Sequence, residues 1–496
     1  MVKHPAIKQV FQQAKDGMLW AGNIIPTQTN PGKTIRNVTP IDNTRIGDIE
    51  VGTKADVDAA VNAARLDFEA GTWSKRAPAE RKKIMLAWVD LLQEHAEELA
   101  ALDCIDAGKP ISECVNTDIP ATISTIAWYA EAIDKCYGKL APTDDKACGI
   151  ICKEAIGVVG VVLPWNFPAQ MFAWKVAPAL ACGNSVIVKP SELSSLSAFK
   201  MVTLAHQAGI PEAALSLVTG LGEEVGATIG LHPDIDMVSF TGSSEVGRLF
   251  LHYSANSNLK EIVLECGGKS PQIVFEDAPL DDIINDVLAA AFWNMGENCS
   301  CGSRLLVQAS VKDQLLNKLI ARLQVDWQPG LPTDPKVKIG ALIEQAHFEK
   351  VCSFLSSAPE EGAKLIYGGK VYSDIGSGWY IEPTIFDEVK PDMRLFQEEV
   401  FGPVLAVTSF DTEEQALALA NDSQYGLAAS LYTLDIKRAH RIARGLRAGT
   451  VSINGFSEGD ITTPFGGYKL SGFGGRDKGL EAFDQYQQTK TIWTVY

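Results

Sequence analysis

The spacing of apolar residues changes near residue 157, and this change separates two kinds of predicted structure. Before it, apolar side chains recur at helical spacing in segments 56–70, 78–107 and 117–137, and each segment is predicted to be a helix. Residues 1–52 show no such period. We therefore expect an irregular, turn-rich start with two or three short strands, opening with an amphipathic segment over 1–15.

From residue 157 onward, short apolar runs alternate with segments long enough for helices. The runs are 158–163, 185–188, 215–218, 237–240 and 261–264. Continuous apolar runs separated by helices are typical of a parallel sheet covered on both faces. They predict a doubly wound α/β unit, and such units bind nucleotides beyond the carboxyl ends of their strands.

A second α/β series follows without a linker or an internal repeat. Its predicted strands are 272–275, 304–308, 405–408 and 428–433, and its predicted helices are 281–295, 312–325 and 413–421. Outside both series, segment 148–152 is typical of one arm of a hairpin, and 489–496 alternates like a strand that no partner follows. Such a terminal strand is either a pairing liability or a docking arm for another subunit.

Charge and composition narrow the range of functions. The chain has 44 basic and 61 acidic residues, a net charge of −17, and no basic run, so neither nucleic acid nor a membrane surface is an expected partner. No apolar run is long enough to span a bilayer, and segment 1–15 lacks the apolar core of a secretory signal, so we expect a cytoplasmic protein. The cysteines are scattered and the seven histidines lie far apart, so neither a disulfide framework nor a metal site is predicted.

One cysteine stands out. Cys299 follows an apolar segment and lies among small or polar residues between Gly296 and Gly302. A turn of this composition leaves backbone amides free to favour the reactive thiolate. The alternative is an inert thiol, because most buried cysteines act as small hydrophobic residues.

Two glycine-containing turns are candidates for binding a phosphate. The turn at 220–226 is one residue too long for the dinucleotide pattern and carries two acids, which favours a plain strand-to-helix turn. The turn at 242–247 opens a helix directly after a strand and is preferred, although Gly-Ser is also an ordinary helix cap. Lys189 and Glu192 follow the second run, where an acid could hold a ribose; a solvated pair is the alternative.

An ordered set of motifs carries a resemblance to a known family. The motifs are Pro164-Trp165-Asn166-Phe167-Pro168, Lys189-Pro190-Ser191-Glu192, Phe240-Thr241-Gly242-Ser243, Glu265-Cys266-Gly267-Gly268-Lys269, Gly296-x-x-Cys299, Glu398-Glu399-x-Phe401-Gly402-Pro403 and Pro464-Phe465-Gly466-Gly467. From about residue 20 to its end, the chain resembles the NAD(P)-dependent aldehyde dehydrogenase superfamily. Within it, the chain is most similar to the aminoaldehyde and γ-glutamyl-γ-aminobutyraldehyde dehydrogenases.

The resemblance implies an α/β fold of three parts, assembled as a homodimer or homotetramer. A doubly wound, Rossmann-like NAD-binding domain is expected over 1–137 and 156–267, and an α/β catalytic domain over 268–475. A small β-hairpin oligomerisation domain is expected over 138–155 and 476–496.

The resemblance also implies the catalytic residues. Cys299 takes the place of the nucleophile, Glu265 that of the general base, Asn166 that of the oxyanion donor, and Lys175 that of a lysine in the proton path. The expected reaction oxidises a small-molecule aldehyde through a thiohemiacetal and a thioester on Cys299. The family's branches that transfer the acyl group to coenzyme A generally lack this glutamate, so hydrolysis to the acid is expected.

The implied cofactor is NAD, with NADP as the alternative. Glu192 would repel a 2′-phosphate, whereas Lys189 nearby would soften that repulsion. The implied cofactor-binding residues are Trp165, Lys189, Ser191, Glu192, Gly222, Phe240, Gly242, Ser243, Val246, Lys350, Glu399 and Phe401.

The resemblance places further residues around the aldehyde tunnel. They are Asp118, Phe167, Met171, Trp174, Trp293, Asn298, Ser300, Phe456, Glu458, Asp460 and Phe465. Glu458 and Asp460, with Asp118 as a third acid, would hold a cationic tail, helped by Phe456 and Trp174 through cation–π contact. This predicts an ω-amino- or ω-acylamino-aldehyde. The alternatives are a solvated loop on a broad aliphatic aldehyde dehydrogenase, a non-catalytic structural protein on the same fold, and a cysteine hydrolase.

Some residues depart from the family pattern. Glu297 stands where a glutamine is usual and brings a further acid close to Cys299. Cys266 and Cys301 are either packing residues, which we favour, or redox partners of Cys299. An extra Gly475 and a shorter acid alter the C-terminal motif, so no proton-relay role is transferred to Asp477.

Overall fold

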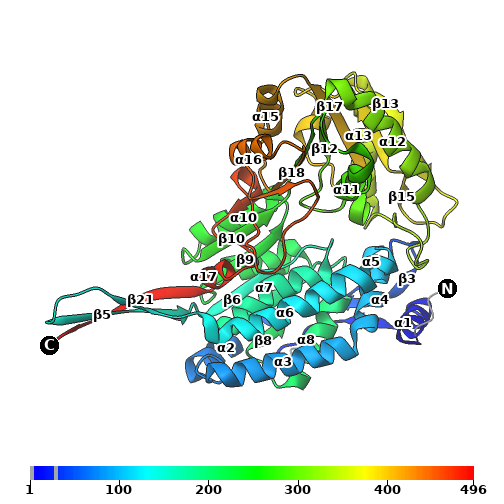
Figure 1. The fold of residues 1–496 in the computed structure, drawn as a ribbon. Helices are drawn as coiled ribbons and strands as arrows, with labels where there is room; N and C mark the ends of the chain where they lie inside the picture. The colour runs from blue at the N-terminus through cyan, green and yellow to red at the C-terminus, as the bar shows by residue number, and fades with distance from the viewer. Residues whose placement is uncertain (1–4, 27–31) are drawn as a thin grey trace.

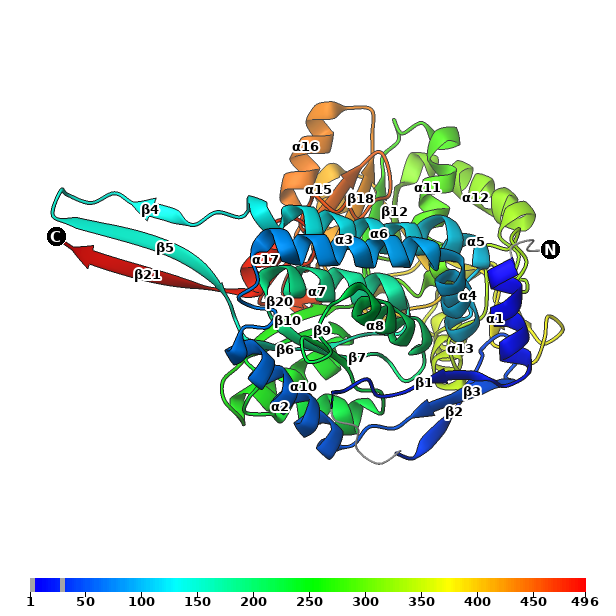
Figure 2. The same cartoon turned by 90° about the horizontal axis from the view of Figure 1, so that it is seen from below.

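A computed structural model describes residues 5–26 and 32–496. The first four residues of the amphipathic segment, and residues 27–31 of the predicted irregular start, lie outside this part. The chain folds into two α/β lobes, from which a narrow β arm projects (Figures 1 and 2).

The first lobe is built on the predicted doubly wound sheet. All five apolar runs after residue 157 form parallel strands, which confirms the prediction. The strands are β6 (Val158–Val162), β7 (Ser185–Lys189), β8 (Leu215–Leu217), β9 (Met237–Gly242) and β10 (Glu261–Cys266). Their order is β10-β9-β6-β7-β8, and the short strand β20 (Gly472–Phe473) adds antiparallel to β10 at the edge.

Helices cover both faces of this sheet (Figure 2). One face packs against α3 (Pro78–Glu94), α4 (Ala96–Ala107), α6 (Ile119–Ala132), α7 (Pro168–Cys182) and α8 (Leu196–Ala208). The other packs against α2 (Lys54–Ala70), α9 (Ala227–Leu231) and α10 (Ser244–Ala255). Alternate residues of β6 serve the two faces, Val159 and Val161 on the first and Val158 and Val162 on the second.

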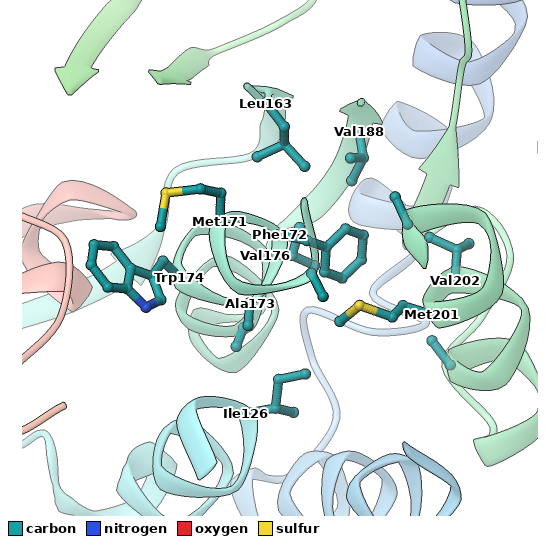
Figure 3. Close-up of a cluster of buried hydrophobic side chains, with 14 of the residues drawn as sticks. Ile126, Leu163, Met171, Phe172, Ala173, Trp174, Val176, Val188, Met201 and Val202 are labelled. Atoms are coloured by element: carbon teal, nitrogen blue, oxygen red, sulfur yellow. The ribbon is translucent and has the colours of Figure 1, made fainter. Parts of the chain in front are cut away.

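Helix α7 lies at the centre of the first face. It begins at Pro168, which suits a first helical turn, and ends at Gly183 in the left-handed conformation (φ 97°). Figure 3 shows Phe172 and Val176 directed toward α8, while Met171 and Trp174 lie on other sides of the helix. One helix therefore supplies the core and also residues for the predicted tunnel.

The second lobe contains the predicted second α/β series. Its sheet order is β13-β16-β17-β12-β11-β18-β19, parallel except for β13. The strands are β11 (Pro271–Val274), β12 (Arg304–Gln308), β13 (Lys364–Tyr367), β16 (Thr384–Asp387), β17 (Val404–Phe410), β18 (Ala428–Tyr432) and β19 (Thr450–Ile453). The helices are α11 (Leu280–Phe292), α12 (Lys312–Asp326), α13 (Gln345–Glu360), α14 (Arg394–Gln397), α15 (Glu413–Asn421) and α16 (Ile436–Gly445).

The arm consists of β4 (Lys139–Ala141), β5 (Ala147–Ala155) and β21 (Gln487–Val495). The predicted hairpin is confirmed, because β4 and β5 pair antiparallel. The terminal strand β21 pairs with β5 along its whole length, as expected from the resemblance, which groups 476–496 with the hairpin. The smaller elements are β1 (Leu19–Ala21), β2 (Thr34–Val38), β3 (Arg45–Glu50), α5 (Ile111–Glu113), β14 (Val371–Tyr372), β15 (Tyr380–Ile381) and α17 (Glu481–Gln485).

Several predicted boundaries need correction. The amphipathic start is a helix, α1 (Pro5–Lys15), and segment 78–107 is two helices separated at His95. The helix predicted over 281–295 ends at Phe292, because the next residues turn into the left-handed conformation. The predicted catalytic range 268–475 includes β20, which belongs to the first sheet.

In the ranges 5–26 and 32–496, no helix combines the length and the apolar character needed to cross a membrane.

Candidate active site

A cavity of about 170 Å³ lies at the carboxyl ends of β6, β9 and β10. It brings together two predicted catalytic residues, Cys299 and Asn166, with many of the predicted cofactor-binding residues. Its lining is Pro164, Trp165, Asn166, Met171, Thr241, Gly242, Ser243, Cys266, Gly267, Cys299, His347, Lys350, Glu399 and Phe401. Residues from both lobes therefore meet at the edge of the sheet where a doubly wound fold binds its ligand.

A left-handed turn between α11 and β12 carries Cys299. Asn294, Met295 and Gly296 all have positive φ, at 52°, 56° and 73°. A Cβ atom on Gly296 would lie 2.3 Å from the Gly402 carbonyl oxygen, so the close approach of the chains requires glycine. Two non-glycine residues held in this conformation are strain of the kind that clusters at functional sites.

Hydrogen bonds hold both the side chain and the backbone carbonyl of Asn166. Its Nδ2 donates to the carbonyl of Glu297 at 3.0 Å. Its own carbonyl accepts from Lys109 Nζ at 2.9 Å and from Asn294 Nδ2 at 3.2 Å. Lys109 is buried and ion-paired with Asp118 at 2.8 Å. Lys109 was not predicted as a site residue, because in the sequence it only precedes a helix-ending proline and gives no other signal.

The surroundings of Cys299 raise the pKa of its thiol well above the ordinary value. Burial is the main cause, and the charges of Glu458, Glu399 and Glu265 add to it, against one favourable backbone amide at Ser300. In the chain by itself, burial and the nearby acids therefore outweigh the one turn amide that favours the thiolate.

Glu265 lies at the end of β10, 4% exposed. Burial and the charge of Asp477 raise the pKa of its carboxyl well above the ordinary value, while Lys175 and Arg476 oppose the shift. Gly466 passes so close that a Cβ there would lie 2.5 Å from Glu265 Oε1. The acid is therefore enclosed by the C-terminal segment rather than solvated.

Lys175 is fully buried on α7. Its Nζ is 3.0 Å from Asp477 Oδ2 and donates to Ser239 Oγ at 3.1 Å. Asp477, left without a role in the sequence analysis, is thus the direct partner of the predicted proton-path lysine. Because the C-terminal motif has an inserted glycine, its spacing did not reveal this contact.

Glu399 is held beside the glycines that follow Glu265. It accepts a hydrogen bond from the Gly268 amide at 2.7 Å, and a Cβ on Gly267 would lie 2.1 Å from its Oε2. Burial raises its pKa to about 7, against the Gly268 amide and the cations Lys350 and Lys269.

The other predicted cofactor residues lie around the first sheet. Lys189 Nζ is 3.1 Å from Glu192 Oε2, and Ser191 Oγ accepts from the Leu193 amide at 3.2 Å. Gly222 opens the turn at 222–226, in open space. Ser243 Oγ caps α10 by accepting from the Val246 amide at 3.2 Å.

Phe240 is part of the core of the first lobe. Its ring packs against Phe250 with centroids 4.9 Å apart, among the core residues beneath α10. It does not line the cavity described above.

The predicted tunnel aromatics form two pairs. Phe167 and Trp293 have ring centroids 5.0 Å apart, and Trp174 and Phe465 have centroids 5.2 Å apart. A second cavity of about 330 Å³ lies beside them, lined by Ala289, Trp293, Phe456, Ser457, Glu458 and Gly459.

Of the three predicted tail-binding acids, Glu458 is closest to the nucleophile. It accepts a hydrogen bond from Ser300 Oγ, which also bonds Asn298 Oδ1. The carboxylate of Asp460 is exposed and accepts from the Thr462 amide at 2.8 Å. Asp118 is 1% exposed and paired with Lys109, so its assignment as a third tail-binding acid is corrected: its charge is already balanced inside the protein.

Glu297 turns away from the cavity. Its Oε1 accepts from the Ile343 amide at 3.1 Å and lies 3.5 Å from His347 Nε2. Burial raises the pKa of the Glu297 carboxyl well above the ordinary value. His347 lines the cavity, where its Nε2 is 2.6 Å from the Phe401 carbonyl. The sequence did not signal this histidine.

The neighbouring cysteines differ in their placement. Cys301 Sγ is buried and donates to the Ala291 carbonyl at 3.3 Å, whereas Cys266 lines the same cavity as Cys299. All ten cysteines are free thiols. Within the part of the chain that the structure describes, no group of three or more His, Cys, Asp or Glu side chains could hold a metal ion.

Comparison with known proteins agrees with this geometry. A profile described as "Aldehyde dehydrogenase family" matches residues 27–492. An aminoacetaldehyde dehydrogenase from Pseudomonas aeruginosa is 51% identical over 463 residues, covering 93% of this chain and 92% of the relative.

Two solved structures are similar over nearly the whole chain. P. syringae AldA, an indole-3-acetaldehyde dehydrogenase solved as a mutant with NAD+ and IAA, superposes with a TM-score of 0.96 at 43% identity. A γ-glutamyl-γ-aminobutyraldehyde dehydrogenase from Burkholderia cenocepacia gives 0.95 at 43% identity. Each match covers 99% of both chains.

Proposed function

Because the chain belongs to the aldehyde dehydrogenase family, we propose that it oxidises small aldehydes to carboxylic acids, with NAD as the hydride acceptor. The observation that carries the proposal is the cavity that Cys299 and Asn166 share with Phe401 and Glu399. A nucleophile, an oxyanion donor and the residues expected around a nicotinamide ribose thus border one space.

The residues present fit a dinucleotide. Thr241 lines the cavity, and its buried Oγ1 has no hydrogen-bond partner among the described residues, which suits a site that a ligand completes. Gly242 and Ser243 lead into the positive end of α10, where a phosphate would lie. Glu192 and Glu399 would hold the two riboses. Glu192 would disfavour a 2′-phosphate and so favours NAD over NADP, although its partner Lys189 softens this preference.

In the first half of the reaction, Cys299 Sγ adds to the aldehyde carbon. The oxygen that becomes negative would be stabilised by the Cys299 amide and by the Asn166 N–H that does not bond Glu297. When bound, the nicotinamide supplies the acceptor for the hydride that the tetrahedral carbon loses, which leaves a thioester on Cys299. Because the resting thiol has a raised pKa, Cys299 must lose its proton as the reaction begins.

In the second half, Glu265 removes a proton from the water that attacks the thioester. A carboxyl with an ordinary pKa is a weak base at neutral pH, and burial strengthens Glu265 in this role. The buried Lys175–Asp477 pair lies behind it and would carry the proton away. The carbon–sulfur bond then breaks, releasing the carboxylic acid and the Cys299 thiolate.

For the substrate, we propose an ω-amino- or ω-acylamino-aldehyde. Glu458 bonds Ser300, the residue after Cys299, so a tail bound by this acid would lie close to the reacting carbon. Relatives described as aminoacetaldehyde and γ-glutamyl-γ-aminobutyraldehyde dehydrogenases support the same substrate class.

The test is a steady-state assay of NAD reduction with 4-aminobutyraldehyde and butyraldehyde. Cys299→Ser is expected to abolish reduction of NAD, whereas Cys301→Ser, whose thiol points away, retains it. Glu458→Gln is expected to lower kcat/KM for the aminoaldehyde by about tenfold, the loss of one charge contact, and to leave butyraldehyde nearly unchanged. If the parent and Glu458→Gln show the same ratio of kcat/KM for 4-aminobutyraldehyde over butyraldehyde, the enzyme is instead a broad aliphatic aldehyde dehydrogenase.

A further inference from the structure

Lys478 is a buried cation in the wall of the predicted tunnel that the mechanism above does not use. It is 4% exposed and has a left-handed backbone conformation, φ 59°. Its Nζ donates to the carbonyl of Glu458 at 2.7 Å and to the carbonyl of Gly459 at 3.1 Å. It therefore holds the backbone of the residue whose carboxylate faces Ser300.

The ammonium also lies against the tunnel aromatics. Lys478 Nζ is 5.1 Å from the ring centroid of Trp174 and 5.4 Å from that of Phe465. These distances are typical of cation–π contact. The Trp174 face, predicted to receive the tail of a substrate, already faces a cation of the protein.

No carboxylate lies within ion-pair distance of Lys478 in the part of the chain that the structure describes. Burying an ammonium without a paired acid costs folding free energy, which makes the position of Lys478 notable. The acids that act on it at longer range are Glu458, Asp460 and Asp477. The positive charge of Lys478 therefore acts on the same part of the predicted tunnel as the Glu458 carboxylate.

We propose that Lys478 is a specificity-determining residue, whose fixed charge offsets Glu458 and so admits aldehydes with uncharged tails beside those with cationic tails. The inference rests on the proposed aldehyde oxidation and adds the residue that sets its tail selectivity. Without Lys478, the acids Glu458 and Asp460 would act unopposed and the tunnel would select cations. With Lys478 present, an aldehyde with an uncharged N-acylated amino tail is used with a kcat/KM only slightly below that of an aldehyde with a free ammonium tail.

The experiment compares three aldehydes: 4-aminobutyraldehyde, its N-acetyl derivative and butyraldehyde. Lys478→Met removes the charge and keeps most of the volume, Lys478→Gln keeps hydrogen-bond donors without charge, and Lys478→Arg keeps the charge. We expect the ratio of kcat/KM for the free amine over the N-acetyl substrate to rise about tenfold in the Met and Gln variants, since one charge at this range in a partly buried site is worth that much. The Arg variant should keep the parental ratio.

A purely structural role for Lys478 predicts a different result. Loosening the 458–459 turn would lower kcat/KM for all three aldehydes together and leave their ratios unchanged, and that outcome overturns the proposal. The same holds if Lys478→Arg shifts the ratio as much as Lys478→Met. Failure of the proposed function is distinguishable, because then no aldehyde is oxidised by the parent enzyme, or Glu458→Gln leaves the parental ratio as it was.

Discussion

At the scale of single residues, burial decides the chemistry of the acids around Cys299. Glu265 and Glu297 are both buried, and both have raised pKa values, but they face different surroundings. Glu265 has Lys175 and Asp477 behind it, whereas Glu297 is tied to the Ile343 amide and lies near His347. Identical residue types therefore have different roles, which only their positions reveal.

The orientation of Glu297 gives a prediction for stability. Its folded-state pKa lies above the ordinary 4.5, so between these values the folded protein holds a proton that the unfolded chain has lost. Its contribution to stability is thus complete in acid and declines as pH rises through this window. Glu297→Gln cannot ionise. We expect it to unfold at a higher temperature than the parent in alkaline buffer, with the difference vanishing in acid below the ordinary carboxyl pKa.

Thermal unfolding followed by circular dichroism across pH checks this expectation. Glu261→Gln is the control, since this acid is exposed at the start of β10. A Glu297→Gln curve parallel to that of the parent at every pH would show that folding does not shift the pKa of Glu297, which would contradict this prediction.

Residue identity alone predicted part of the site. Cys299, Asn166, Glu399 and Phe401 belong to the ordered motifs, and the structure brings all of them to one cavity. Other residues could not be found this way, because Lys109, His347 and Lys478 act through contacts with segments distant in sequence. For example, Lys478 contacts the backbone of Glu458, and no spacing rule links the two.

At the scale of elements, apolar periodicity predicted the strands well and the helix ends less well. The five strands of the first lobe are buried except at Gly242 and Glu261, which end β9 and begin β10, and their apolar composition predicts them clearly. The helix before Cys299 was predicted too long, since Met295 is apolar and continues the pattern. Close backbone approach to Gly402 overrides the local helical signal there, and periodicity carries no information about such an approach.

The left-handed turn before Cys299 gives a prediction for Gly296→Ala. The new Cβ would lie 2.3 Å from the Gly402 carbonyl at φ 73°, so we expect a loss of about 2–4 kcal/mol from strain and overpacking together, with activity lost as well. Urea unfolding and aldehyde turnover measure the two effects.

Gly362→Ala is the matched control for backbone strain alone. This glycine also has positive φ, 103°, but its nearest neighbour would be the end of the Met393 side chain at 3.7 Å. It should cost about 1–2 kcal/mol and leave turnover unchanged. Equal losses of stability and activity in both variants would mean that the approach to Gly402 has no special importance.

At the scale of the whole molecule, the chain passes between the two lobes and the arm more often than the sequence indicated. The C-terminal segment passes beside Glu265 at Gly466, adds β20 to the first sheet and then joins the arm as β21. The alternation of residues 489–496 predicted a strand without naming its partner, and only the family resemblance grouped 476–496 with the hairpin. Pairing between β21 and β5 joins residues more than 330 positions apart, which local patterns cannot predict.

The arm also has an exposed apolar face on which the expected homodimer or homotetramer could form. Leu140, Ile150 and Ile492 lie in one cross-strand row and are 72%, 41% and 45% exposed, so they form an apolar face suited to another copy of the chain. We expect Ile492→Lys to shift the protein toward a smaller species in size-exclusion chromatography with light scattering.

Thr491→Lys is the control on the same strand, because neighbouring residues of a strand point to opposite faces. It should leave the assembly intact. If both variants behave alike, or if the parent is already a monomer, this face of the arm does not join subunits.

The most direct test of the account is to trap the acyl group on the enzyme. Glu265→Gln should form the thioester but hydrolyse it slowly, with turnover lowered about 10²–10⁴-fold, the usual contribution of a general base. The variant is mixed with aldehyde and NAD, quenched in acid and mapped by tandem mass spectrometry. The account predicts one equivalent of reduced dinucleotide and one acyl group, located on Cys299. An acyl group on Cys301, or full turnover without any adduct, would contradict it.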